Sequence, residues 1–389
     1  MEAVYLKKNR EKSILNRHPW IFSGALQSRA SHIEDGDMVA VCSSDGVHLG
    51  YGYFNSRTPI AIRMLSFSER PVTKDYLGEL LTNALNKRTH NPLLSGTSAI
   101  RLVFSEGDFL PGLIVDRYNE HLVVQFLTLG MEKLRDPIIN LLVELVQPAG
   151  IYERSEHEGR KLEGISERCG QVYGTTPEEV VIEENGVSIL VNLHHGQKTG
   201  FFIDQRENRL MIQGLARDRS ILNLFSYTGG FSLHALKGGA REVISVDSSQ
   251  DALGMAERNA ELNGFHKNSR YIKSDVFQYI REAPLDSSLI ICDPPALVKN
   301  RSSLEKGCRG YKDLNLQIAR RCPAGTLLLT CSCSRFVDMD LFQKVLFSAL
   351  ADSGRNGSIL GKFNHPGDHP VSIYCPETEY LKAVLLYIE

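Results

Sequence analysis

The stretch that decides the fold is Ile221-Leu222-Asn223-Leu224-Phe225-Ser226-Tyr227-Thr228-Gly229-Gly230-Phe231, an apolar run that leads into a pair of glycines. Short continuous apolar runs of this kind are typical of strands buried on both faces of a parallel sheet. The glycines predict a tight turn at which the backbone can approach a ligand closely, because no Cβ obstructs it. The stretch therefore predicts the first strand and helix of an α/β domain, with a ligand site between them.

Three further apolar runs follow this stretch, at Val243–Val246, Leu289–Cys292 and Thr326–Thr330. A helix is predicted over Ser248–Asn263, with serines to cap its start and Gly264 just past its end. Strands that alternate with helices predict an open, doubly wound sheet whose ligands bind at the carboxyl ends of the strands. We expect this α/β architecture over residues 196–389.

The N-terminal part of the chain has a different pattern, in which short apolar runs are separated by turn signals. Asp45-Gly46 lies between Met38–Val41 and Val47–Gly50, and this arrangement is typical of a β-hairpin. A small β-barrel or sandwich is therefore predicted over residues 1–72.

The middle of the chain mixes helical and strand periods. The leucines of Tyr76–Arg88 are spaced as in a helix, while Leu113–Tyr118 and Leu122–Leu127 resemble strands joined at Asn119-Glu120. We expect a small α+β domain here. The predicted domains are residues 1–72, 73–195 and 196–389.

The charge balance of the chain excludes one class of partner. Its 389 residues hold 44 lysines and arginines against 46 aspartates and glutamates. This sum excludes a uniformly basic, histone-like nucleic-acid binder, but a local basic patch remains compatible with it. The basic residues that gather within the first 30 positions are Lys7, Lys8, Arg10, Lys12, Arg17 and Arg29.

The segment at the start lacks the apolar core of a secretory signal, and the chain has no run of about 18 uncharged apolar residues. Its eight cysteines are too sparse for a disulfide scaffold. His194 and His195 would point to opposite faces of a strand, and no third ligand has suitable spacing. We therefore expect a cytoplasmic protein with reduced thiols, no membrane span and no metal.

The turn Tyr227-Thr228-Gly229-Gly230 and the acidic residue that ends the next strand, Asp247, indicate a cofactor site. A carboxylate at this place can accept hydrogen bonds from the two hydroxyls of a ribose. The turn lacks the G-x-G-x-x-G pattern of a pyrophosphate site, which argues against a nicotinamide oxidoreductase. A nucleoside cofactor without phosphates, S-adenosylmethionine, fits better. Asp275 can bind the adenine amino group, or it can simply cap a helix.

Two residues at the same edge of the predicted sheet indicate the chemistry. Asp293-Pro294-Pro295 ends one strand, and the prolines hold the carboxylate rigidly, where it suits a contact with a substrate base. Cys333 follows Thr326–Thr330. Carbon 5 of a pyrimidine is a poor nucleophile, and a thiolate that adds at carbon 6 activates it for methylation. The alternative, a small buried cysteine without a role, is less consistent with a position facing Asp293.

Taken together, the motifs resemble the bacterial large-subunit rRNA cytosine-C5 methyltransferases, and the resemblance covers nearly the whole chain in order. The motifs that carry it are Tyr152-Glu153-Arg154-Ser155, Gln197-Lys198-Thr199-Gly200-Phe201-Phe202-Ile203-Asp204-Gln205-Arg206, Phe225-Ser226-Tyr227-Thr228-Gly229-Gly230-Phe231, Asp293-Pro294-Pro295, Cys308-Arg309-Gly310-Tyr311-Lys312-Asp313, Ser332-Cys333-Ser334 and Asp368-His369-Pro370-Val371.

The resemblance implies an N-terminal PUA domain that binds RNA, a central α+β domain and a Rossmann-like class I methyltransferase domain. It implies S-adenosylmethionine as methyl donor, Cys333 as the nucleophile, and a segment Lys198–Arg206 that closes over the cofactor. It also allows a homodimer. The cofactor contacts expected on this basis include Phe202, Asp204, Arg206, Asp293 and Pro294. The expected RNA contacts are Lys198, Lys7, Lys8 and Arg10, since basic side chains beside a PUA-like barrel suit phosphate binding.

Ala296 distinguishes this chain from two related patterns. Many RNA cytosine-C5 methyltransferases have a second cysteine at this place, and methyltransferases that act on amines usually have an aromatic residue there. The predicted function is formation of 5-methylcytosine in 23S rRNA through a covalent Cys333 adduct. The alternatives are an rRNA guanine or adenine amino methyltransferase of the same fold and a non-catalytic ribosome-assembly factor that binds RNA. Cys331 receives no role.

Overall fold

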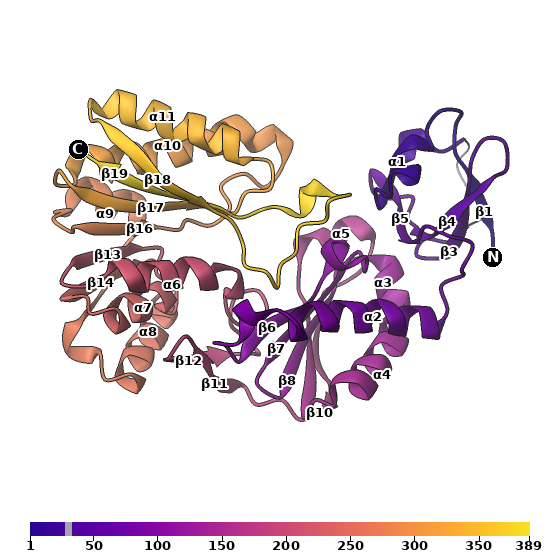
Figure 1. The fold of residues 1–389 in the computed structure, drawn as a ribbon, viewed down its shortest axis with the longest axis horizontal. Helices are drawn as coiled ribbons and strands as arrows, with labels where there is room; N and C mark the ends of the chain where they lie inside the picture. The colour runs from indigo at the N-terminus through magenta and orange to yellow at the C-terminus, as the bar shows by residue number, and fades with distance from the viewer. Residues whose placement is uncertain (28–32) are drawn as a thin grey trace. The chain divides into compact units, whose positions relative to one another are not determined.

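The computed structural model describes residues 1–27 and 33–389, which form two compact units (Figure 1). Arg29 lies outside the described residues. Unit 1 consists of Met1–Ile182, Val191–Ile203 and Gly367–Thr378. Unit 2 consists of Glu183–Leu190, Asp204–Pro366 and Glu379–Glu389. Among the helices of the described ranges, none combines the length and the apolar character that a membrane crossing requires.

Unit 2 is built on a seven-stranded sheet in the order β15-β14-β13-β16-β17-β19-β18. The strands are β13 (Ser220–Leu224), β14 (Glu242–Asp247), β15 (Ser269–Lys273), β16 (Leu289–Cys292), β17 (Thr326–Ser332), β18 (Gly357–Phe363) and β19 (Lys382–Ile388). The first five in this order are parallel, whereas β19 runs antiparallel to both β17 and β18. All five parallel strands therefore end at one edge of the sheet.

Helices cover both faces of this sheet, as Figure 1 shows. They are α6 (Arg206–Leu215), α7 (Gly230–Lys237), α8 (Gln250–Leu262), α9 (Val276–Glu282), α10 (Leu304–Arg321) and α11 (Met339–Ser353). Side chains alternate along each strand, so Leu222 packs in one core with α9, α10 and α11, while Ile221 packs in the other with α6 and α7. The predicted doubly wound α/β fold is confirmed.

The predicted bounds in unit 2 are close to those observed. The side chain of Ser249 accepts a hydrogen bond from Ala252 N at the start of α8, and Gly264 follows its end with φ +73°. Strand β17 continues two residues beyond the predicted Thr330, so Cys333 is the first residue after the strand. The sequence patterns did not predict β18 or β19.

The N-terminal part of unit 1 is a five-stranded sheet in the order β1-β3-β4-β5-β2, next to the short helix α1 (Lys12–Leu15). Its strands are β1 (Ala3–Tyr5), β2 (Trp20–Phe22), β3 (Met38–Cys42), β4 (His48–Phe54) and β5 (Ile60–Ser66). The predicted hairpin is confirmed, because β3 and β4 pair antiparallel and Gly46 adopts φ +84° in the turn.

A second five-stranded sheet in unit 1 has the order β10-β9-β8-β7-β6. Its strands are β6 (Ala99–Phe104), β7 (Leu113–Tyr118), β8 (His121–Phe126), β9 (Gly150–Ser155) and β10 (Arg168–Gly174). Helices α2 (Lys74–Thr89), α3 (Leu129–Lys133), α4 (Arg135–Val146) and α5 (Glu158–Glu163) accompany it. The strands β11 (Glu179–Glu184) and β12 (Val187–Asn192) form a separate two-stranded sheet, through which the boundary of the units passes.

The prediction that His194 and His195 lie on a strand was wrong. Strand β12 ends at Asn192, and both histidines lie in the turn after it. The Asn192 side chain accepts hydrogen bonds from His194 N at 3.0 Å and from His195 N at 2.7 Å. An asparagine that binds the backbone two residues on favours a turn over a continued strand.

Candidate active site

The glycine-containing turn after β13 has the tight geometry that its sequence predicts. Phe225 and Tyr227 adopt φ +59° and +47°, and Gly229 adopts φ +83°. A Cβ on Gly229 would lie 3.0 Å from the Cβ of Ala256. Only glycine adopts this backbone without strain, and its lack of a side chain lets the turn lie directly against α8.

The carboxylate of Asp247 joins this turn to the end of β14. Its Oδ2 accepts a hydrogen bond from Tyr227 N at 2.8 Å, and its Oδ1 accepts one from Ser249 N at 2.9 Å. Each carboxylate oxygen keeps a second lone pair. Asp247 is thus fixed in place while it retains acceptor capacity for the hydroxyls of a ligand.

Two hydroxyls of the same turn are unsatisfied. Within the described parts of the chain, Ser226 Oγ and Thr228 Oγ1 are buried without a hydrogen-bond partner. Buried polar atoms are normally paired, because leaving one unpaired costs about 1–3 kcal/mol. A polar ligand at the turn would satisfy them, so these residues fit a nucleoside cofactor.

Asp275 lies one strand further along the edge, after β15. It caps α9, where its Oδ1 accepts a hydrogen bond from Gln278 N at 3.0 Å, and the residue is exposed. The backbone N–H of Ser274 donates to the carbonyl of Asp247 at 3.0 Å, which keeps the two strand ends together. The capping role is therefore observed, and the contact with adenine stays a prediction.

Asp293 follows β16 directly, and its carboxylate is held by Gln205, which is far from it in sequence. Its Oδ2 accepts a hydrogen bond from Gln205 Nε2 at 2.9 Å, and Gln205 Oε1 accepts one from Asn208 Nδ2 at 2.6 Å. Pro294 is buried, whereas Ala296 is exposed. Gln205 lies within one of the motifs that carry the family resemblance, but no sequence pattern indicates its role.

Cys333 lies in the loop after β17, and contacts with the segment after β16 and with α10 fix this loop in place. The residue is half-buried, and its Sγ is 3.9 Å from the carbonyl oxygen of Pro294. The adjacent Ser334 Oγ accepts a hydrogen bond from Val298 N at 3.0 Å and shares one with Tyr311 OH at 2.8 Å. These contacts join the ends of β16 and β17, so Cys333 and the Asp293-Pro294 segment lie at the same site.

Cys331 differs sharply from Cys333, although only one residue separates them. Cys331 is fully buried, and burial, together with the charge of Asp293, raises the pKa of its thiol well above the usual value. Burial likewise raises the pKa of Cys292 at the end of β16. Both thiols are therefore neutral near pH 7, which suits a structural role, whereas a nucleophile must form a thiolate.

The predicted cofactor residues Asp204 and Arg206 lie at the start of α6 in unit 2. Asp204 is buried, and its Oδ2 accepts a hydrogen bond from Tyr380 OH at 2.5 Å. The Tyr380 ring stacks on His365, with 5.2 Å between the ring centroids. Arg206 is 1% exposed. Both side chains are thus buried within unit 2, and their contacts with the cofactor stay predictions.

Lys198 and Phe202 belong to unit 1, where a buried network holds their segment. The Lys198 Nζ lies 4.4 Å from the centroid of the Phe202 ring. Between them, Thr199 Oγ1 donates a hydrogen bond to Asp116 Oδ2 at 2.6 Å, and Asp116 is paired with Arg101 at 2.8 Å. Their roles toward the cofactor and RNA stay predictions.

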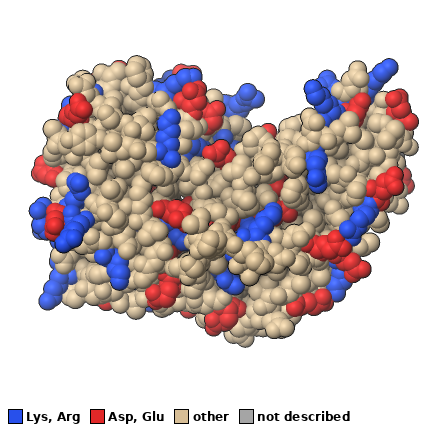
Figure 2. Space-filling view, in the orientation of Figure 1, with Lys and Arg blue, Asp and Glu red and all other residues tan. Residues whose placement is uncertain are grey.

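The basic side chains near the N-terminus lie at the surface of unit 1. Lys7, Lys8 and Arg10 are exposed, and Lys7 Nζ donates a hydrogen bond to Gly24 O at 2.9 Å. On the face drawn in Figure 2, basic and acidic side chains occur in small mixed groups rather than in one basic field. An open pocket of about 460 Å³ beside α1 is lined by Asn9, Arg10, Lys12, Ser13, His18, Trp20, Ile21, Phe22, Gly24 and Ala25.

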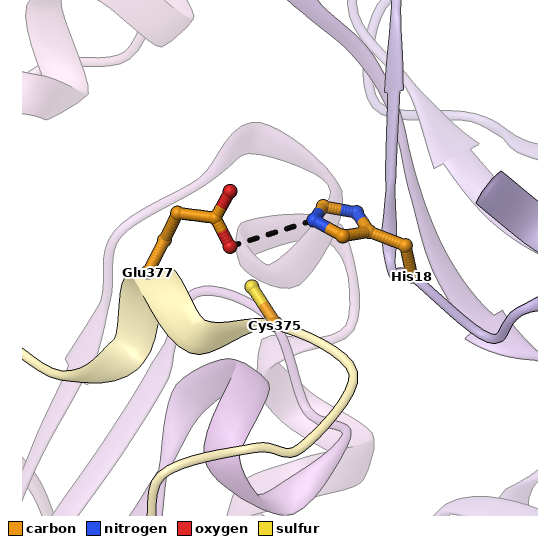
Figure 3. Close-up of side chains that lie close together, drawn as sticks. All are labelled: His18, Cys375 and Glu377. Carbon is orange, nitrogen blue, oxygen red and sulfur yellow. Dashed lines mark ion pairs between the residues drawn. The ribbon is translucent and has the colours of Figure 1, made fainter.

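One cluster in the described residues has the spacing of a metal site, and the sequence analysis missed it. It consists of His18, Cys375 and Glu377, whose side chains point toward one another (Figure 3). His18 Nδ1 accepts a hydrogen bond from Trp20 N at 3.1 Å, so the neutral ring carries its proton on Nε2. That nitrogen lies 3.5 Å from Glu377 Oε2. A protonated Nε2 cannot bind a metal, and the geometry therefore favours a hydrogen-bonded contact.

Comparison with known proteins identifies the family. A PUA-like domain family matches residues 4–67, and a family of S-adenosylmethionine-dependent methyltransferases matches residues 160–354. Ribosomal RNA large subunit methyltransferase I of Aeromonas salmonicida is 43% identical to this chain, over 98% of each protein. That of Vibrio vulnificus is 39% identical, again over 98% of each. The chain belongs to the ribosomal RNA large subunit methyltransferase I family.

Membership of this family confirms the predicted resemblance and the predicted cofactor, S-adenosylmethionine. The solved structure of SMU.776 complexed with SAH has the same fold, with a TM-score of 0.87 and 24% identity, and the match covers 99% of this chain and 100% of that one. The PUA-like domain and the Rossmann-like methyltransferase domain are thus both present.

Proposed function

We propose that this methyltransferase forms 5-methylcytosine in large-subunit ribosomal RNA through a covalent bond between Cys333 and the target base. The relatives in its family are named for the methylation of this RNA. The observation that carries the proposal is the position of Cys333, which is half-buried, with its Sγ 3.9 Å from Pro294 O and next to Asp293 at the edge where the parallel strands end.

The cofactor would be held by the edge that β13, β14 and β15 form. Asp247 would accept hydrogen bonds from the ribose hydroxyls, and Asp275 would accept one from the adenine amino group. When bound, S-adenosylmethionine supplies an electrophilic methyl group. The other residues proposed to contact it are Phe202, Asp204, Arg206, Tyr227, Thr228, Gly229, Gly230, Asp293 and Pro294.

The thiolate of Cys333 would add to carbon 6 of the cytosine and push an electron pair onto carbon 5, which then takes up the methyl group. The N3 atom of this adduct would take up a proton from solvent water, and the Asp293 carboxylate would accept a hydrogen bond from the N3–H group. Gln205 keeps that carboxylate oriented. Loss of the carbon-5 proton to a base, and return of the N3 proton to solvent, would then release the Cys333 thiolate and leave 5-methylcytosine.

The target base must leave any stack before it can reach Cys333, at a cost of about a few kcal/mol unless it is already unpaired. Exposed cations support the RNA elsewhere: Lys7, Lys8 and Arg10 on the PUA-like domain, together with Lys198, would bind phosphates. We further propose that the chain is divided into three domains, at residues 1–72, 73–195 and 196–389, and that the protein acts in the cytoplasm.

Methyl transfer to protein-free large-subunit rRNA tests the proposal, with the product identified by mass spectrometry of the nucleosides. The wild type should yield 5-methylcytosine, and Cys333→Ala should be slower by more than about a thousandfold, as expected for removal of a nucleophile. Cys331→Ala is the matched control, because it removes a neighbouring thiol that is fully buried.

Two results would contradict this assignment. Undiminished activity of Cys333→Ala with methylguanine or methyladenine as the product would indicate an amino methyltransferase. Tight RNA binding by the wild type, without binding of S-adenosylmethionine, would indicate an assembly factor.

A further inference from the structure

A buried lysine lies beside the proposed nucleophile. Lys382 is the first residue of β19 and pairs in register with Ser332, the residue before Cys333. Only 2% of Lys382 is exposed. Its Nζ donates hydrogen bonds to Ser334 O at 2.7 Å and to Tyr380 O at 2.6 Å. An ammonium group has three protons to donate, so these two carbonyls leave one proton for another acceptor.

The charges around Lys382 indicate which group accepts the third proton of its ammonium. Burial lowers the pKa of Lys382 to about 8, while the negative charges of Cys333, Glu379 and Asp338 favour its protonated form, and Cys333 contributes most among the three. A lysine is rarely buried without a counter-charge. Near pH 7 Lys382 is mostly protonated, and a thiolate at Cys333 would be the strongest of these three compensating charges.

We propose that Lys382 is the cation that stabilises the thiolate of Cys333, and that it is therefore a positioning residue for the nucleophile. This inference rests on the function proposed above for Cys333. In the step that it promotes, the thiol gives its proton to solvent water and the sulfur keeps the electron pair. Lys382 remains protonated, so a thiolate–ammonium pair replaces a neutral thiol next to a buried cation.

Among the described residues, Asp293, Tyr311 and Cys331 also lie close to Cys333, and none of them supplies positive charge. Tyr311, from α10, is fully buried, and burial raises the pKa of its phenol. Cys331, from β17, is neutral for the same reason. A phenol can donate a hydrogen bond and the Asp293 carboxylate opposes a thiolate, so among these neighbours only Lys382 carries a charge that attracts one. Asp338 and Glu379 face Lys382 and oppose its deprotonation.

The test measures how the alkylation rate of Cys333 by iodoacetamide depends on pH, in the full-length protein. Mass spectrometry of the Cys333 peptide separates its signal from that of the exposed Cys169. Lys382→Met should raise the midpoint of the pH profile by about one unit or more, as expected when an opposite charge is lost. At pH 7 this corresponds to an alkylation rate about tenfold lower. Lys382→Arg keeps the charge and should stay within about half a unit of the wild type.

A matched control separates charge from loop structure. Ser334→Ala removes the hydroxyl that binds Val298 N and Tyr311 OH, so it loosens the same loop without changing its charge. Its midpoint should equal that of the wild type. If Lys382→Met does not fold, Lys382→Gln replaces it, because an amide can still donate to Ser334 O.

The inference would be overturned if Lys382→Met, or the glutamine variant in its place, kept the wild-type midpoint, or if Ser334→Ala shifted it equally. Alkylation requires neither RNA nor S-adenosylmethionine, so this result is independent of methyl transfer by Cys333→Ala. A shifted midpoint together with an active Cys333→Ala enzyme would refute the proposed function alone. An unshifted midpoint together with an inactive Cys333→Ala enzyme would refute only the role of Lys382.

Discussion

The two halves of the strand edge in unit 2 are built in different ways. In the half formed by β13 and β14, Asp247 binds the backbone of Tyr227 and of Ser249, and all three lie close together in sequence, between the end of β13 and the start of α8. In the half formed by β16 and β17, Asp293 depends on Gln205, which is 88 residues away in sequence. The loop of Cys333 depends on Lys382, which donates to Ser334 O across 48 residues.

The cofactor half is therefore a local structure, and the nucleophile half is assembled from segments that are distant in sequence. Backbone geometry and a single carboxylate fix the first half, so its substitutions should change cofactor affinity. Side chains from α6, α10 and β19 orient the second half, so its substitutions should change the rate of the reaction while cofactor affinity remains. The predictions below test whether the two halves are separable in this way.

Asp247→Ala should have the largest effect on the cofactor half. It removes the charged acceptor of two proposed hydrogen bonds donated by the ribose hydroxyls, each worth about 1.5 kcal/mol or more. The affinity for S-adenosylhomocysteine, measured by calorimetry, should fall about 100-fold, because about 3 kcal/mol is lost. Alkylation of Cys333 at pH 7 should be unchanged.

The matched control for this variant is Asp251→Ala, which removes an exposed carboxylate from the first turn of α8. Its affinity should remain within about twofold of the wild type, since exposed substitutions usually have small effects. Equal losses in both variants would mean that general electrostatics, and not a specific contact, holds the cofactor. A changed Cys333 reactivity in Asp247→Ala would show that the two halves are coupled.

Gln205→Leu should have an intermediate effect, and on the other half. It removes the amide that donates to Asp293 Oδ2, a hydrogen bond to a charged group worth about 1.5 kcal/mol. We expect the kcat for methyl transfer to fall about tenfold, with affinity for S-adenosylhomocysteine within about twofold. Gln343→Leu, an exposed substitution on α11, is the control. A large loss of cofactor affinity with unchanged kcat would reverse the assignment of Gln205 to the nucleophile half.

The same difference explains how much of the site the sequence could predict. Gly229 and Asp247 were identifiable because Asp247 ends an apolar strand and Gly229 lies in the turn that follows one, and such positions are visible in a sequence. Cys333 and Asp293 were found for the same reason. These four residues mark where strands end, and the alternation of strand and helix places all such ends at one edge.

The supporting residues could not be found in this way, because no local pattern specifies their contacts. Lys382 begins a strand that the sequence analysis did not predict, and its partner is a backbone carbonyl. Gln205 lies before α6, where its sequence neighbours do not reveal that its side chain reaches Asp293. Strand β12 ends at Asn192, whose side chain accepts hydrogen bonds from the backbone N–H groups of His194 and His195, so both histidines lie in a turn.

Substitutions of Asp275 should have the smallest effect. They can still separate its two possible roles, because helix capping and adenine binding make different demands on its side chain. Serine is as good a helix cap as aspartate, whereas alanine is worse by about 1 kcal/mol. Asp275→Ser should therefore keep the free energy of unfolding of the wild type, but its shorter side chain cannot reach the adenine amino group. If that contact exists, the affinity for S-adenosylhomocysteine should fall about fivefold, as expected for one hydrogen bond of about 1 kcal/mol. Unchanged affinity in Asp275→Ser, with destabilisation in Asp275→Ala, would assign the residue to capping alone and would confine specific recognition in the cofactor half to Asp247 and the glycine turn.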